Sequence, residues 1–163
     1  MYDRLLVPTD GSFAVERAIS HAIDLAEVHD AAIDALYVVN ATSYGGLPME
    51  TAWDGIGRAL EDEGAAAVER VRELAAEREA DIPVRTCVVN GSPSRSIVEH
   101  ARSNECDLIV MGTHGRGGID RLLLGSVAER VVRSAPIPVT TVRVGDDEQD
   151  EAEGRSEAVA TAE

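Results

Sequence analysis

The feature that most constrains the fold is a regular alternation of short apolar runs with longer segments of helical periodicity. The runs have the length of buried strands, whereas the segments between them repeat apolar residues every three or four positions. Parallel strands joined by helical crossovers form a sheet with helices on both faces. The sequence therefore predicts one α/β domain, with strands at residues 4–7, 33–39, 84–89, 108–111 and 137–142.

Local signals set the boundaries of the expected helices. Residues 13–29 and 56–78 each carry one apolar stripe at helical spacing. Gly91, Ser92 and Pro93 supply a turn, a capping serine and a proline at the first helical position, so a third helix should begin there.

Two further regions lead to specific expectations. Residues 40–57 contain four glycines and no clear periodicity, which predicts a long loop that is either a lid or simply mobile. A last helix should begin near Gly125. Its expected inner face consists of Val127, Ala128, Val131 and Val132.

The segment 107–132 carries the strongest functional signal. An apolar run ends at Gly112, glycines and polar residues follow, and a helical pattern resumes near Gly125. Such a loop exposes backbone N–H groups at the positive end of a helix dipole, where phosphate binds favourably. The spacing is neither the dinucleotide fingerprint nor the P-loop pattern. The chain also contains no lysine, so it has no P-loop lysine.

The spacing instead resembles the nucleotide-binding signature of the universal stress protein family, in its ATP-binding subclass. Gly112, Gly115, Gly125 and Ser126 fill the fixed positions of that pattern. Similar matches at residues 7–10, 89–93 and 136–139 extend the resemblance over roughly residues 1–143. The resemblance implies a Rossmann-like, doubly wound open sheet of five parallel strands in the order 3-2-1-4-5.

The resemblance also implies ATP as the ligand. In that arrangement Asp10 contacts the nucleoside, where its carboxylate could accept hydrogen bonds from ribose hydroxyls. The backbone of Val38 meets the adenine edge, and the glycine-rich segment holds the phosphates. A magnesium or manganese ion could accompany the triphosphate, held mainly by phosphate and water oxygens. The candidate ligand-binding residues are Pro8, Thr9, Asp10, Val38, Met111, Gly112, Gly115, Arg116, Gly125, Ser126 and Val127.

Structural alternatives exist for several of these residues. Asp10 could form an Asx turn or cap the first helix, which is compatible with a ligand role. Val39 could replace Val38 if the alignment slips by one residue. Met111 could be an ordinary core residue, and Gly125 could serve close packing.

The remaining alternatives concern the polar residues of the segment. Ser126 could merely cap the last helix. Arg116 and Arg121 could reach a terminal phosphate, or could be exposed or paired with Asp120. His114 is expected to be structural or peripheral, because nothing nearby completes a catalytic group.

Composition excludes other classes of function. The net charge of −15 argues against nucleic acid as a partner, because phosphate recognition relies on clustered cations. All 15 basic residues are arginine, against 30 acidic residues, and this acidic surface suggests a high-salt, halophilic cytoplasm. No apolar run approaches the length of a membrane span, so no membrane association and a cytoplasmic location are expected. Cys87 and Cys106 are expected to be reduced, buried or half-buried thiols.

The domain should span residues 1–144. Residues 145–163 contain eight acidic residues and one arginine, with almost no apolar side chain to bury, so an acidic disordered tail is expected.

The leading functional hypothesis is an ATP-binding universal stress protein that acts as a stress-response or signalling module. The resemblance suggests a homodimer formed through the last strand, residues 137–142. An ATPase or phosphotransferase is a second hypothesis, but Asp10 and the arginines are its only candidate residues, so dedicated catalysis is not expected. A dimeric interaction module without a nucleotide is the third.

Overall fold

The computed structural model describes residues 1–40, 50–78, 81–114 and 124–144, with side chains from residue 55 onward in the second helix. All five strands pair in parallel in one sheet of order β3-β2-β1-β4-β5, which confirms the predicted fold class and strand order. The strands are β1 (Arg4–Pro8), β2 (Ala32–Val39), β3 (Val84–Asn90), β4 (Leu108–Gly112) and β5 (Val139–Val142).

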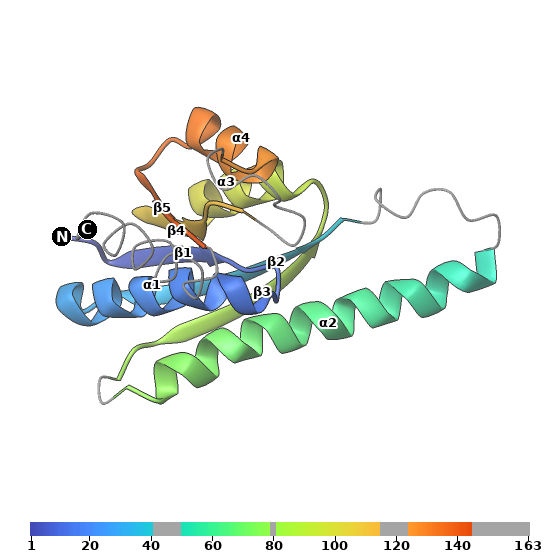
Figure 1. Cartoon of the computed structure of the whole chain (residues 1–163), viewed down its shortest axis with the longest axis horizontal. Helices are drawn as coiled ribbons and strands as arrows, with labels where there is room; N and C mark the ends of the chain where they lie inside the picture. The colour runs from blue at the N-terminus through green and yellow to red at the C-terminus, as the bar shows by residue number, and fades with distance from the viewer. Residues whose placement is uncertain (41–49, 79–80, 115–123, 145–163) are drawn as a thin grey trace, which may run out of the picture.

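Helices cover both faces of the sheet. In Figure 1, α1 and α2 lie on one face, and α3 and α4 lie on the other. The helical elements are η1 (Phe13–Val15), α1 (Glu16–His29), α2 (Glu50–Ala76), α3 (Pro93–Ser103) and α4 (Ser126–Ser134). Each expected helix is therefore present, although α2 begins six residues before its predicted start.

The core consists of two aliphatic layers separated by the sheet. Leu5 points into the layer under α1 and α2, whereas its neighbour Leu6 points into the layer under α3 and α4, and both are 0% exposed. Burial on this scale stabilises the fold by about 1.5–3 kcal/mol per large aliphatic side chain. Because β1 pairs with both β2 and β4, it is the central strand and its position is fixed on every side.

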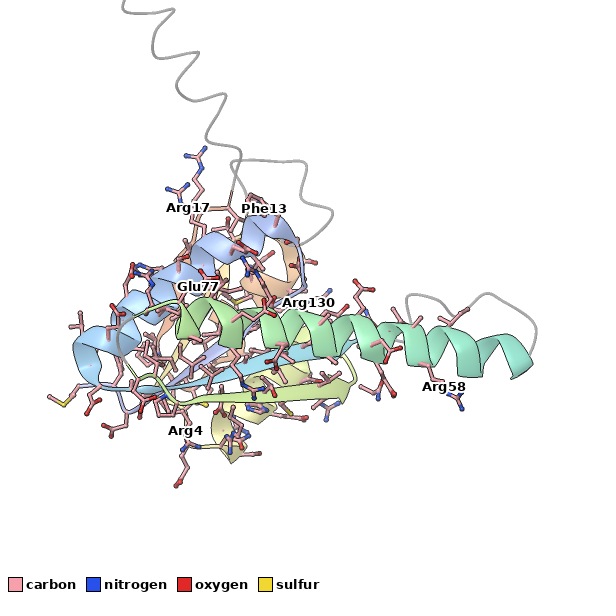
Figure 2. The ribbon with its side chains drawn as sticks, turned by 90° about the horizontal axis from the view of Figure 1, so that it is seen from below. Arg4, Phe13, Arg17, Arg58, Glu77 and Arg130 are labelled. Carbon is pink, nitrogen blue, oxygen red and sulfur yellow. The ribbon has the colours of Figure 1, made fainter. Side chains whose placement is uncertain are left out.

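The predicted loop at residues 40–57 is wrong over its second half, because α2 already begins at Glu50; residues 41–49 lie outside the described part. The first turns of α2 extend past the end of the sheet (Figure 1), and Figure 2 shows Arg58 pointing away from the domain. Side-chain atoms added at Gly55 and Gly57 would meet nothing within 4 Å. The helix can continue here without an apolar stripe, because it extends cooperatively from the packed turns that follow.

Three smaller expectations also need correction. Ser92 occupies the N-cap position before Pro93, but its side chain makes no capping hydrogen bond. In α4, Ala128 and Val131 are buried as predicted, whereas Val132 is 46% exposed and Val127 is only half-buried, because this nine-residue helix buries one narrow stripe.

The last strand begins two residues later than expected, at Val139 rather than at Ile137. The cause is the pair of prolines that precede it. Pro136 and Pro138 have no N–H for the ladder, although the C=O of Pro138 still accepts a hydrogen bond from Ile109 N at 3.0 Å.

The chain reverses its winding direction between β1 and β4, which makes their carboxyl ends a topological switch point. In their register Leu6 lies beside Ile109. Continuing this register by three residues sets Thr9 beside Gly112. The turn that leaves β1 and the segment that leaves β4 therefore begin next to each other.

Candidate functional site

The turn after β1 is tightly organised by its own polar groups. Thr9 N donates to the C=O of Leu36 at 2.9 Å, which ties the start of the turn to β2. Oδ1 of Asp10 accepts hydrogen bonds from Ser12 N at 2.9 Å and from Ser12 Oγ at 2.6 Å. Gly11 has a φ of 74°, a conformation that glycine adopts without strain. The Asx-turn interpretation of Asp10 is therefore confirmed.

The second carboxylate oxygen of Asp10 is in a different situation. Oδ2 is buried, and no described residue hydrogen-bonds to it. Leaving a buried polar atom unpaired costs about 1–3 kcal/mol, and more when the group is charged. Asp10 thus fixes the turn with one oxygen, and its other oxygen is a buried acceptor at the switch point that has no partner among the described residues.

The chain that leaves β4 is fixed through Thr113. Its N–H donates to the C=O of Val142 at 2.9 Å, and its C=O accepts from Gly125 N at 2.7 Å. The second of these bonds brings the start of α4 directly beside the end of β4. The Thr113 hydroxyl oxygen also lies 3.0 Å from Nδ1 of His114.

The start of α4 has an open set of backbone donors. Glu129 N makes the first hydrogen bond back to Gly125 C=O, so the N–H groups of Ser126, Val127 and Ala128 precede the helical ladder. Gly125 is the N-cap residue and has no side-chain oxygen that could cap them. The sequence pattern implied that the Gly125 N–H would be free to bind a phosphate. This N–H instead donates to the C=O of Thr113, so it is not a free donor.

Gly112 and Met111 are both buried at the end of β4. A Cβ at Gly112 would lie 3.1 Å from Cγ1 of Val144. Gly112 therefore makes room for the chain's own segment after β5. Met111 is 6% exposed and belongs to the core layer under α3 and α4, which supports its interpretation as a core residue.

The hydrogen bonding of β2 distinguishes Val38 from Val39. The C=O of Val39 accepts from Gly91 N at 3.0 Å, so the backbone groups of Val39 face β3. In a parallel strand successive residues face opposite neighbours, so those of Val38 face β1. Since β1 ends at Pro8, which pairs with Leu36, Val38 extends beyond the end of that neighbour. The geometry favours Val38 as the residue whose backbone is accessible to a ligand.

A cavity of about 200 Å³ lies on the other side of the β1 turn, between α1 and α2. Its charged lining residues are Glu16, Glu63 and Arg70. Arg70 Nε lies 2.8 Å from Glu16 Oε1, so the guanidinium charge is already balanced. The cavity therefore offers a phosphate little attraction, and the anion-binding features lie on the side of α4.

The structure brings most of the predicted site residues together. Asp10, Val38 and Gly112 lie at the carboxyl ends of three neighbouring strands, and the bond between Gly125 and Thr113 joins α4 to them. Gly115 and Arg116, together with Arg121 and Asp120, lie outside the described residues. Those brought to the carboxyl edge are Pro8, Thr9, Asp10, Val38, Met111, Gly112, Gly125, Ser126 and Val127.

Sequence reasoning missed a buried polar cluster in β2. Asp34 is 2% exposed, and its carboxylate accepts from Arg85 Nε at 3.0 Å and lies 3.1 Å from His100 Nε2. The available signal was one aspartate inside an otherwise apolar strand. Its partners lie 51 and 66 residues away in sequence, so no local pattern could identify them.

The model for the universal stress protein family matches residues 1–143 of this chain. The chain belongs to the universal stress protein family. It is 42% identical over 143 residues to the universal stress protein MJ0531 of Methanocaldococcus jannaschii, a match that covers 88% of this chain and 83% of that protein. The resemblance recognised in the sequence is thus confirmed at the level of the family.

Solved structures of the family share the fold. The structure of hypothetical protein MJ0577 aligns with a TM-score of 0.79 and 26% identity, over 90% of this chain and 99% of that chain. A universal stress protein in complex with cAMP aligns with a TM-score of 0.58 and 26% identity, over 88% of this chain and 98% of that chain. An adenine nucleotide is therefore a ligand of at least one family member with this fold.

The described residues contain neither a membrane-spanning helix nor a cluster of metal-binding side chains. None of the described helices has the length and hydropathy needed to cross a lipid bilayer. The same residues contain no group of three or more His, Cys, Asp or Glu side chains placed to bind a metal ion.

Proposed function

We propose that this family member binds ATP at the carboxyl edge of the sheet and acts as a nucleotide-dependent stress-response or signalling module. The observation that carries the proposal is the buried, unused Oδ2 of Asp10 at the switch point. A ribose hydroxyl is a suitable donor for such an acceptor. The cAMP complex of a related universal stress protein supports an adenine nucleotide as the ligand class.

The rest of the site has donors that suit the remaining parts of the nucleotide. The backbone of Val38, beyond the end of β1, provides polar groups for the adenine edge. The uncapped N–H groups of Ser126 and Val127 suit phosphate oxygens, assisted by the dipole of α4. Gly115 and Arg116 would join them from outside the described residues. A magnesium or manganese ion would be held by phosphate and water oxygens.

Calorimetric titration with ATP, ADP, AMP and adenosine tests the proposal. Wild-type protein should bind ATP, and Asp10→Ala should bind it at least about tenfold more weakly, because a hydrogen bond to a charged group contributes about 1.5–3 kcal/mol. His21→Ala, a change at an exposed position of α1, is the matched control and should bind like wild type. Absence of binding to all four ligands would contradict the proposal.

We further propose that the working form is a homodimer joined through residues 137–142. β5 is an edge strand with β4 as its partner in the sheet, and its four residues are only half-buried. Edge strands of this kind need to be covered. Light scattering after size exclusion in molar salt should give twice the chain mass, and a monomer alone would refute this assembly.

The acidic composition supports a high-salt cytoplasm as the place of action. With a net charge of −15, self-repulsion should destabilise the fold at low ionic strength, and screening should relieve it. Chemical denaturation across a salt series should show stability that rises with salt. Equal stability at low and molar salt would argue against this habitat.

A further inference from the structure

His114 carries a second unused polar atom at the same edge of the sheet. Its Nε2 is buried without a hydrogen-bond partner among the described residues, as is Oδ2 of Asp10. These two atoms come from the segments that leave β4 and β1, which lie next to each other. The sequence pattern assigned His114 no role beyond a structural or peripheral one.

The contacts of Thr113 indicate which nitrogen of His114 carries the proton. The Thr113 hydroxyl oxygen lies 3.0 Å from Nδ1 of His114 and accepts a longer hydrogen bond, 3.4 Å, from Val144 N. The hydroxyl that accepts from Val144 N still has its own proton to donate to Nδ1, and in that arrangement the ring hydrogen is on Nε2. The unused atom of His114 is then a donor.

An unused donor and an unused acceptor at the same edge of the sheet restrict the class of ligand that can pair with both. Asp10 Oδ2 requires a donor such as a sugar hydroxyl, whereas His114 Nε2 requires an acceptor such as an anionic oxygen. Thr113, the neighbour of His114, accepts a hydrogen bond through its C=O from Gly125, the residue that precedes the open N–H groups of α4. His114 thus lies on the phosphate side of the site, in a chain that has no lysine to supply a charged donor.

We propose that Nε2 of His114 donates a hydrogen bond to a phosphate oxygen of the bound nucleotide and thereby sets the preference for phosphorylated ligands over the free nucleoside. This inference rests on the proposed nucleotide binding. It gives the histidine the positioning role that a phosphate-binding lysine has elsewhere.

Calorimetric titration of adenosine, AMP and ATP into wild type, His114→Ala and His114→Gln tests it. His114→Ala should bind AMP and ATP about 10- to 100-fold more weakly, as expected for a lost hydrogen bond to a charged group. Its adenosine affinity should stay within about twofold, because the lost bond involves only phosphate. His114→Gln should recover much of the loss, because its side-chain amide nitrogen can replace Nε2 as a donor.

The outcomes separate this inference from the proposed function. Wild-type protein that binds none of the three ligands overturns both. Wild-type binding of AMP that His114→Ala leaves unchanged overturns the inference alone. An equal loss of adenosine and AMP affinity in His114→Ala also overturns it, because a purely structural role would weaken both ligands. His21→Ala, at an exposed histidine, should match wild type throughout.

Discussion

Two regions of the molecule combine an aspartate with a histidine, and their hydrogen bonding is opposite. In the β2 cluster, formed by Asp34, Arg85 and His100, the carboxylate oxygens of Asp34 are bonded to Arg85 and lie beside the His100 ring. In the switch-point pair, formed by Asp10 and His114, each side chain keeps one buried atom without a partner among the described residues. The same two residue types therefore serve different purposes.

In the β2 cluster, the negative charge of Asp34 is balanced by partners from the protein itself. Burial raises the pKa of Asp34, but the hydrogen bonds to His100 and Arg85 lower it by more than burial raises it. The pKa of Asp34 therefore lies below its usual value of 3.8. Burial, aided by the negative charge of Asp34, raises the pKa of the Cys106 thiol to about 12. Cys106 is thus a buried thiol with little nucleophilic character at neutral pH.

The contrast teaches how to separate structural from functional polar groups in this fold. A buried charge whose partners are all supplied by the protein contributes to stability and offers a ligand nothing. A buried group left incomplete costs stability, and a ligand that completes it recovers that cost on binding. The β2 cluster should respond to mutation in stability, and the switch-point pair in ligand binding.

The largest expected effect on stability comes from Asp34→Ala. It leaves His100 Nε2 buried without its carboxylate, whereas Arg85 is half exposed and can turn to water. We expect a loss of about 2–3 kcal/mol in the free energy of unfolding, measured by chemical denaturation. Asp10→Ala, which removes only a local turn contact, should cost less than about 1 kcal/mol. Equal losses at the two positions would remove the distinction.

Substitutions of His100 and His114 should differ in their effect on stability in the same way, but by a smaller amount. His100→Ala removes one of the partners of Asp34 and should lower the free energy of unfolding by about 1–2 kcal/mol. His114→Gln should change stability by less than about 1 kcal/mol in the absence of ligand, because it loses only the contact of Nδ1 with the neighbouring Thr113 hydroxyl, and Nε2 has no described protein partner. A larger loss in His114→Gln than in His100→Ala would show that His114 is structural.

The smallest expected effect is the contribution of the Asp34 charge to the pH dependence of stability, which acid titration measures. Because its folded pKa lies below its unfolded value, Asp34 contributes stability that is fully present above pH 3.8 and is lost as pH falls through the lower, folded value. The unfolding free energy of wild type should therefore decrease more steeply below pH 3.8 than that of Asp34→Asn. Parallel curves would show that the cluster does not hold Asp34 ionised.

Much of the fold could be predicted because it follows from local periodicity. Apolar runs and amphipathic helices are visible in the sequence, and the family resemblance supplied the strand order. The start of α2 could not be predicted, because Gly55 and Gly57 disfavour a helix and residues 50–55 carry no apolar stripe in the sequence. Asp34 was missed because its partners are distant in sequence.

The candidate site was predictable in its location but not in its hydrogen bonding. The glycine spacing identified the segment around Gly112 and Gly125. Whether a given N–H is free depends on tertiary contacts, and Thr113 occupies the one on Gly125. The unused Nε2 of His114 is likewise a property of the folded chain, because no pattern in sequence shows which side chain lacks a partner.

The most direct test of ATP binding at the switch point is thermal unfolding with and without ATP, at a concentration about 100-fold above its dissociation constant for wild type. Wild type and Asp34→Asn should both gain about 5–10 °C on addition of ATP, even though Asp34→Asn starts from a lower melting temperature. Asp10→Asn, which replaces the unused acceptor with a donor, should melt near wild type without ATP and gain little with it. An equal gain in Asp10→Asn and wild type would contradict the site.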